Sequence, residues 1–309
     1  MILMKFTVRL LLILGLLLLG PIPAGTGGAE QVEVETQIQA LLGSTGVEFG
    51  VHVVLAGKGV LLSRNASVPR HAASAIKTAI LVDLLRFRGD QLDQVPRGVE
   101  ALLQVGTHPA FAGFLPEELA RAREHLPGRT YLELARIMMG RTDAPNEVYN
   151  AACNVIMVKL GGPPAIARRL HDLDPALEGI DIHRYMQSWN GDGDNTATPE
   201  ALVNLYSMTS SRSVPGLGAE CVSTLRSLLL EDGDGGPGSI FGKVGTLYPE
   251  PMVRVHAGFQ DRAGGDLVFA VMGEVSHPPA ENPTERFVEL MSVVDELARL
   301  CRDLAPSIR

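Results

Sequence analysis

The order of the predicted elements along the chain is the feature that most constrains its fold. Runs rich in β-branched and aromatic residues occur near both ends, and the stretch between them is helical wherever it has a pattern. The runs are 48–56 and 60–63 near the start and 239–245, 252–259 and 266–275 near the end, with helices over 30–42 and 283–304 outside them. Short loops favour antiparallel pairing, so the first two strands join the last three only if the helical block is an excursion from one sheet.

We therefore predict an α+β fold, an α/β/α sandwich in which terminal helices flank a five-stranded antiparallel sheet beside an all-helical lobe. The helical segments expected in the middle of the chain are 74–88, 116–125, 130–140, 147–160, 163–173 and 199–210. One domain over 30–309 is expected, with a discontinuous sheet lobe (about 30–69 and 214–309) and a helical lobe (about 70–213). A cleft between two such lobes is a favoured place for a small-molecule site.

Composition excludes several classes of protein. A chain of 309 residues with 46% hydrophobic and 20% charged residues can bury a sizeable core and is not disordered. The net charge of -8 is opposite in sign to that of proteins that bind nucleic acid or an anionic membrane surface, so neither partner is expected. Three cysteines are too few for a disulfide scaffold and cannot all pair within one chain.

The first 29 residues have the pattern of a secretion signal. Lys5 and Arg9 precede an apolar run over 10–20, and proline and small residues follow up to Ala29. The apolar run is shorter than the roughly 20 residues of a membrane-spanning helix, although an uncleaved N-terminal anchor is an alternative. We expect a signal peptide over 1–29 and a periplasmic or secreted protein that meets the membrane only through this segment.

Ser74 and Lys77 are the first candidates for chemistry. They lie one helical turn apart where the chain enters the helix over 74–88, so the hydroxyl and the amine can touch. A neutral lysine amine can accept the serine proton, and the N–H groups at a helix N-terminus can stabilise an oxyanion. The alternative is a capping serine followed by a solvated lysine, because serine is a common N-cap residue.

Two further motifs accompany this pair. Lys243-Val-Gly-Thr246 lies on the third predicted strand, where Gly245 would let a substrate approach the backbone and Thr246 offers an N–H and a hydroxyl. Between the two motifs, Val148-Tyr-Asn150 begins the helix over 147–160.

The order and spacing of these motifs resemble the serine β-lactamase and penicillin-binding-protein superfamily, and class A β-lactamases above all. The resemblance covers nearly all of residues 30–309. It implies the serine β-lactamase/DD-peptidase-like fold, with Ser74, Lys77, Asn150 and Lys243 as catalytic residues. Gly245, Thr246 and Asn190 are implied as substrate-binding residues, and Arg184 is implied to pin its loop through Asp194, for which Asn195 competes.

Three positions depart from the family pattern. Val148 falls on the serine of the S-x-N motif and has no hydroxyl to move a proton, and a gapped alignment could bring Thr142-Asp143 near that place instead. Val244 replaces a threonine or serine in the strand motif, leaving Lys243 and Thr246 to bind a substrate carboxylate.

The third departure concerns the loop that carries the general base. Arg184-Tyr-Met186-Gln-Ser-Trp-Asn190 is similar to the class A R-W-E-x-x-L-N stretch, and Met186 stands where the family's glutamate activates the deacylating water. Loss of one positioned general base typically lowers a rate by about 10²–10⁴-fold. Slow deacylation is therefore expected unless Gln187 or Asp192 substitutes.

The sequence predicts a secreted serine hydrolase that forms an acyl-enzyme at Ser74 with β-lactams or peptidoglycan-peptide-like amides, of β-lactamase or DD-peptidase type. The alternative is a non-catalytic cell-wall binding module on the same fold. We expect a monomer, small-molecule or peptide partners, no nucleic acid and no cofactor. No metal site is expected, because the acidic stretch at 190–194 lacks the later ligands of a calcium loop.

Overall fold

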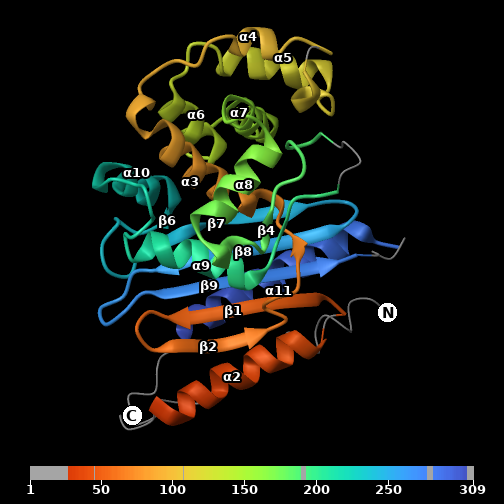
Figure 1. Cartoon of the computed structure of the whole chain (residues 1–309). Coiled ribbons are helices and arrows are strands. Elements are labelled where there is room, and N and C mark those ends of the chain that lie inside the picture. Colours follow the sequence, from red (N-terminus) through yellow and green to blue (C-terminus); the bar gives the residue numbers. More distant parts are fainter. Residues whose placement is uncertain (1–26, 45, 107, 189–192, 277–280, 305–309) are drawn as a thin grey trace.

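A computed structural model describes residues 27–44, 46–106, 108–188, 193–276 and 281–304. The chain has the α+β architecture predicted from its sequence, with a large antiparallel sheet and a group of helices beyond one sheet edge (Figure 1). The signal-peptide prediction falls mostly on residues 1–26, which lie outside the described residues.

The large sheet joins strands from both ends of the chain. Its order is β2-β1-β9-β8-β7-β6, and each neighbouring pair is antiparallel. The strands are β1 (Glu48–Leu55), β2 (Gly59–Arg64), β6 (Leu230–Asp232), β7 (Ile240–Leu247), β8 (Met252–Gln260) and β9 (Leu267–Val275). Strand β9 is buried at every position because helices cover both of its faces.

Helices cover the two faces of this sheet differently. On one face α2 (Gly27–Ser44) and α11 (Pro283–Asp303) pack together, and α11 contributes Leu290, Val294 and Leu297 to the core below the sheet. On the opposite face α9 (Pro199–Ser210) lies across β1, β8 and β9. The prediction that terminal helices flank the sheet is therefore confirmed.

The remaining helices lie on the side of the sheet where β7 and the edge strand β6 lie (Figure 1). They are α3 (Lys77–Arg88), α4 (Val99–Leu102), α5 (Pro116–His125), α6 (Tyr131–Met138), α7 (Asn146–Lys159), α8 (Pro163–Leu173) and α10 (Ala219–Leu229). Helix α3 is buried on nearly all sides, and the buried Asp83 carboxylate on it accepts two hydrogen bonds from Arg169 of α8, at 2.8 and 2.6 Å.

The prediction of five strands in the main sheet was wrong by one. The sixth strand, β6, spans three residues and pairs with the start of β7 across a register irregularity. Its sequence, Leu-Glu-Asp, is too short and too acidic to show the alternation that marks a strand. Helix α10 and a small sheet of β3 (Arg70–His71), β5 (Thr196–Ala197) and β4 (Ile180–Asp181) were also missing from the prediction.

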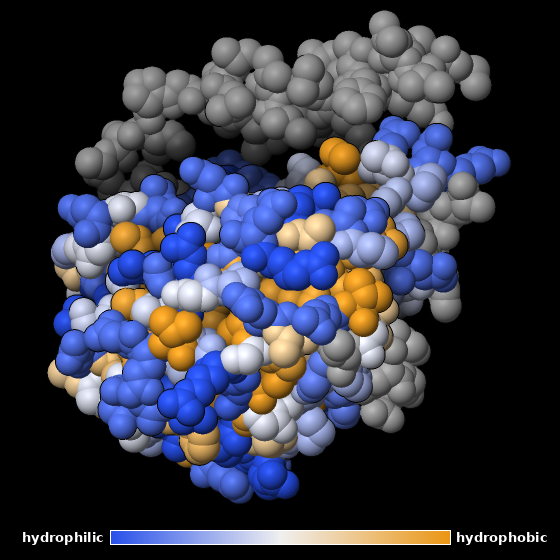
Figure 2. Space-filling view, turned by 90° about the horizontal axis from the view of Figure 1, so that it is seen from above, coloured by the Kyte–Doolittle hydropathy of each residue, from blue (hydrophilic) through white to orange (hydrophobic). Residues whose placement is uncertain are grey.

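Seen from above, much of the surface is hydrophilic, and apolar side chains gather in several patches among the hydrophilic ones (Figure 2). Within the described ranges, no helix has the length and apolarity required to cross a membrane.

Candidate active site

Ser74 lies in a short 3-10 helix, η1 (Ala73–Ile76), directly before α3. The sequence predicted one helix from residue 74, but the first turn has the tighter 3-10 form and α3 begins at Lys77. Ala73 enters this turn with φ +46°, a left-handed conformation that is unfavourable for a residue with a Cβ atom. The half-buried Ser74 is thus held in a strained, tightly packed turn.

Lys77 is almost completely buried at the start of α3, with 2% of its surface exposed. Its Nζ donates a hydrogen bond to Asn150 Oδ1 at 2.8 Å, which joins α3 to α7. Burial lowers the pKa of Lys77 to about 8; nearby Cys153 opposes this shift and the positive charge of Lys243 adds to it. At pH 7 roughly a tenth of this amine is therefore uncharged and able to accept a proton, far more than for a lysine in water.

Strand β7 packs directly against the Ser74 turn through Gly245. A Cβ atom at this glycine would lie 2.7 Å from the Ser74 nitrogen and 2.8 Å from the Ala75 nitrogen. Glycine is therefore required for this close approach of two backbones. On the same strand Lys243 and Val244 are partly buried and Thr246 is exposed.

Lys243 lies in a group of charged residues at this end of the sheet. Burial lowers the pKa of Lys243; the Glu231 carboxylate opposes this shift, and Arg141 and Arg254 add to it. The Arg254 guanidinium makes two hydrogen bonds to Asp295 of α11, at 3.0 and 2.7 Å. Arg254 is therefore held in place beside Thr246, its register partner across β7 and β8.

Asn154 connects helix α7, which also carries Asn150, to the loop that carries Met186. Its amide accepts a hydrogen bond from the Met186 N–H at 2.7 Å and donates to the Met186 carbonyl at 2.9 Å. The same amide nitrogen donates to the Ala110 carbonyl at 2.6 Å. Sequence analysis assigned no role to Asn154, although a polar residue four positions after Asn150 in a buried helix is the kind of signal that could have revealed it.

The rest of this loop is held by two side chains that the sequence singled out. Arg184 pairs with Asp194 at 2.8 Å, and Asn195 accepts hydrogen bonds from the backbone of His183 and Arg184 at 2.9 and 3.0 Å. Asp194 and Asn195 therefore do not compete for Arg184: Asp194 pairs with its side chain, and Asn195 binds its backbone N–H. Two predicted residues, Asn190 and Asp192, lie outside the described part of the chain, and Gln187 is exposed.

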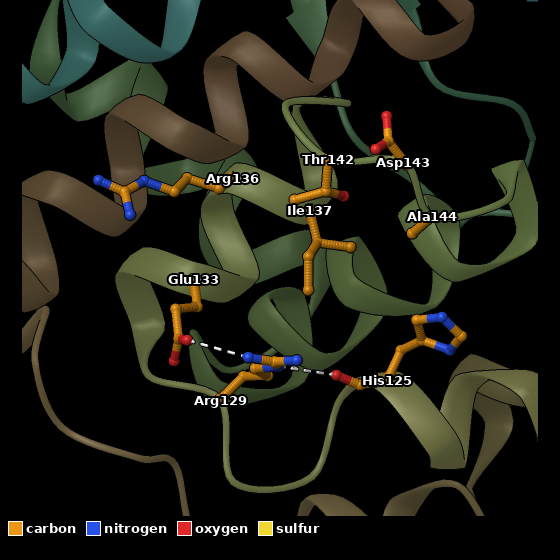
Figure 3. A pocket seen from close by; sticks show the side chains of 8 residues that line it. All are labelled: His125, Arg129, Glu133, Arg136, Ile137, Thr142, Asp143 and Ala144. Atoms are coloured by element: carbon orange, nitrogen blue, oxygen red, sulfur yellow. Dashed lines mark hydrogen bonds and ion pairs between the residues drawn. The ribbon is translucent and has the colours of Figure 1, made fainter.

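Neither candidate for the missing serine places a hydroxyl in the buried group around Lys77. Val148 is completely buried in α7. Thr142 is exposed and, with Asp143, lines a groove of about 430 Å³ beside α6 (Figure 3). That groove is also lined by Arg129 and Glu133, which form an ion pair at 3.1 Å. Its lining includes none of Ser74, Lys77, Asn150 and Lys243.

Solved β-lactamase structures superpose on most of the chain. The β-lactamase from Streptomyces albus G is 19% identical with a TM-score of 0.63, covering 88% of this chain and 100% of its own. A β-lactamase from Chitinophaga pinensis is 16% identical with a TM-score of 0.66, covering 88% of this chain and 98% of its own. A variant of the reconstructed last common ancestor of Gram-negative class A β-lactamases is 19% identical, with a TM-score of 0.62 over 88% of this chain and 97% of its own.

No family model matches the chain, and neither does any curated protein. At these identities the likeness establishes the fold alone. The chain therefore has the fold of the class A serine β-lactamases that its sequence resembles.

Proposed function

We propose that this protein is a serine hydrolase that forms a covalent acyl-enzyme at Ser74 with β-lactams or peptidoglycan-peptide-like amides. The observation that carries the proposal is the state of Lys77, which lies one turn after Ser74. Its amine is buried, has a lowered pKa and donates a hydrogen bond to Asn150. A buried lysine with one amide partner and no carboxylate among its described hydrogen bonds is suited to act as a base. The signal-like residues 1–29 support a periplasmic or secreted location.

In the acylation step the Ser74 hydroxyl attacks the amide carbonyl and Lys77 takes the hydroxyl proton. The N–H groups of Ser74 and Thr246 hold the oxyanion, and Lys243 attracts a substrate carboxylate. The C–N bond then breaks, and the leaving nitrogen takes a proton from the Lys77 ammonium or from water, because Val148 offers no hydroxyl. Asn150 keeps Lys77 in place and orients the substrate amide.

Deacylation is the step for which the described residues of this loop offer no base at the position of the family's glutamate. Met186 cannot take a proton from water, and Asn154 holds its backbone at both the N–H and the carbonyl. The acyl-enzyme is therefore expected to persist, as in a penicillin-binding protein rather than an efficient β-lactamase. A deacylation half-life under a second would contradict this expectation.

A second candidate function is a cell-wall binding module without catalysis. It is favoured by three apolar residues, Val148, Val244 and Met186, at places where the family has hydroxyl or carboxyl groups. Intact-mass spectrometry after incubation with a penicillin separates the two candidates. We expect a stable adduct with the mass of the whole penicillin on the natural chain and none on Ser74→Ala; Ser63→Ala, an exposed serine on β2, is the matched control. An unmodified natural chain at high penicillin concentration would favour the binding module.

The rate of acylation is expected to rise with pH and to reach half its maximum near pH 8. The reason is that the neutral form of Lys77 is the base, and its fraction grows as the pH passes through its pKa. In Lys243→Gln the midpoint should move to higher pH, because the charge of Lys243 lowers the pKa of Lys77. The measurement is the saturating acylation rate of a chromogenic β-lactam between about pH 5.5 and 9.5. A midpoint that stays unchanged in Lys243→Gln would mean that a group other than Lys77 sets the pH dependence of acylation.

A further inference from the structure

Two neighbouring strands of the large sheet carry glutamates at directly opposed positions. Glu48 of β1 and Glu274 of β9 are register partners, so their side chains leave the same face of the sheet. Like charges directly opposite each other across a strand pair are destabilising. This pair therefore needs positive charge from another element.

Strand β3 supplies that charge with two consecutive basic residues. Arg70 pairs with the exposed Glu48 at 3.3 Å and donates to the Phe49 carbonyl at 3.2 Å. His71 Nδ1 lies 3.0 Å from Oε2 of the buried Glu274, and the His71 backbone N–H lies 3.4 Å from the same oxygen. The other oxygen of Glu274 accepts a hydrogen bond from Ser276 at 3.0 Å.

The residues that follow His71 lead straight into the Ser74 turn. The Ala72 N–H donates to the Asn195 carbonyl at 2.9 Å, and Ala73 then adopts its left-handed conformation. A backbone strained in this way persists only where the surrounding contacts fix it. His71 provides such a contact, because it ties the start of the turn to the central strand β9.

We propose that the His71–Glu274 ion pair positions the Ser74 nucleophile by fixing the strained backbone between β3 and η1. The pair acts through residues 72 and 73 and makes the placement of Ser74 depend on pH. This inference rests on the proposed acylation of Ser74, and one arm of its test is independent of that reaction.

The charges around His71 set the direction of the pH effect. The hydrogen bond to Glu274 raises the pKa of His71 above its ordinary value of 6.5; Asp194 adds to this shift, while burial and Arg184 oppose it. Burial raises the pKa of Glu274, but the stronger combined effect of His71 and Ser276 lowers it. Because the pKa of His71 is raised and that of Glu274 is lowered on folding, the pair's stabilisation is complete between about pH 4.5 and pH 6.5. It is lost as the pH rises through the raised pKa of His71, and also as the pH falls through the lowered pKa of Glu274.

The test compares His71→Asn, whose amide can donate one hydrogen bond without a charge, with Glu274→Gln and the natural chain. The matched control is His171→Asn. His171 lies on α8, its side chain is 31% exposed, and its Nε2 lies 3.9 Å from the carboxylate of Asp181 on β4. Between about pH 5.5 and 6.5, where both partners are charged, we expect both site variants to be acylated about 10–100-fold more slowly, because small displacements of a nucleophile lower rates by this order. The ratio of natural to His71→Asn rates should shrink as the pH rises, while the His171→Asn ratio stays constant.

The second arm is backbone amide hydrogen exchange of the peptide over residues 70–77, which needs no substrate. Faster exchange there in His71→Asn and Glu274→Gln, but not in His171→Asn, is the expected result. A rate ratio that does not vary with pH, or unchanged exchange over 70–77, would overturn the positioning role. If the natural chain forms no acyl adduct while exchange still increases, the failure lies in the proposed function and not in the anchoring of the turn.

Discussion

Replacing Met186 by glutamate is expected to shorten the life of the acyl-enzyme by about 10²–10⁴-fold, the usual contribution of one positioned general base. The backbone at this position is already fixed, since Asn154 binds both the N–H and the carbonyl of Met186. The glutamate side chain has nearly the length of methionine, and only 8% of the Met186 surface is exposed. The new carboxylate would therefore be attached to a fixed backbone at a position largely shielded from solvent.

The environment should also help a new carboxylate to act as a base. Burial raises the pKa of a carboxyl group toward neutrality, where it accepts a proton from water most effectively. The measurement is the decay of the penicillin adduct by time-resolved intact-mass spectrometry. Met186→Gln is the matched control, because it has the same shape as the glutamate variant without a basic group.

Two outcomes would contradict the role assigned to Met186. Equal acceleration in Met186→Glu and Met186→Gln would mean that polarity alone admits water to the adduct. No acceleration in a Met186→Glu protein with natural thermal stability and natural acylation would show that position 186 does not face the acyl group.

The strands and most helices could be predicted because their signals are local. Helices α5, α8 and α9 begin and end at the residues predicted, each with proline in its first turn. Strand β6 was missed because its three residues have no strand pattern of their own. They are extended because they pair with β7. The 3-10 turn at Ser74 has no sequence signal either, since it follows from packing against Gly245.

The candidate site was predictable where residues repeat a known spacing and not where distant residues meet. Ser74, Lys77 and Asn150 were identified from short motifs, and the hydrogen bond between Lys77 and Asn150 joins two of them. Glu274 lies 203 residues after His71, so no local pattern connects them. That neither Val148 nor Thr142 brings a hydroxyl into the buried group around Lys77 could be seen only in three dimensions, because one gap in an alignment decides which of them falls on the motif.

Replacing Gly245 by alanine is expected to lower the acylation rate by about 100-fold or more, the order of effect that a displacement of about 1 Å has on a reacting group. The added Cβ would lie under 3.0 Å from two backbone nitrogens of the Ser74 turn, and neither can rotate away as a flexible side chain would. Strand β7 and η1 must therefore separate, which moves Thr246 and Lys243 away from Ser74.

The loss should fall on the reaction more than on the fold. Overpacking at one position typically lowers the free energy of unfolding by about 1–3 kcal/mol, which a chain of this size tolerates. Gly218→Ala is the matched control, because nothing lies within 4 Å of a Cβ atom at that glycine. The two variants are compared by stopped-flow acylation and by urea unfolding. Natural acylation by a folded Gly245→Ala protein would mean that β7 does not form one wall of the site, and the oxyanion role of Thr246 would then fail with it.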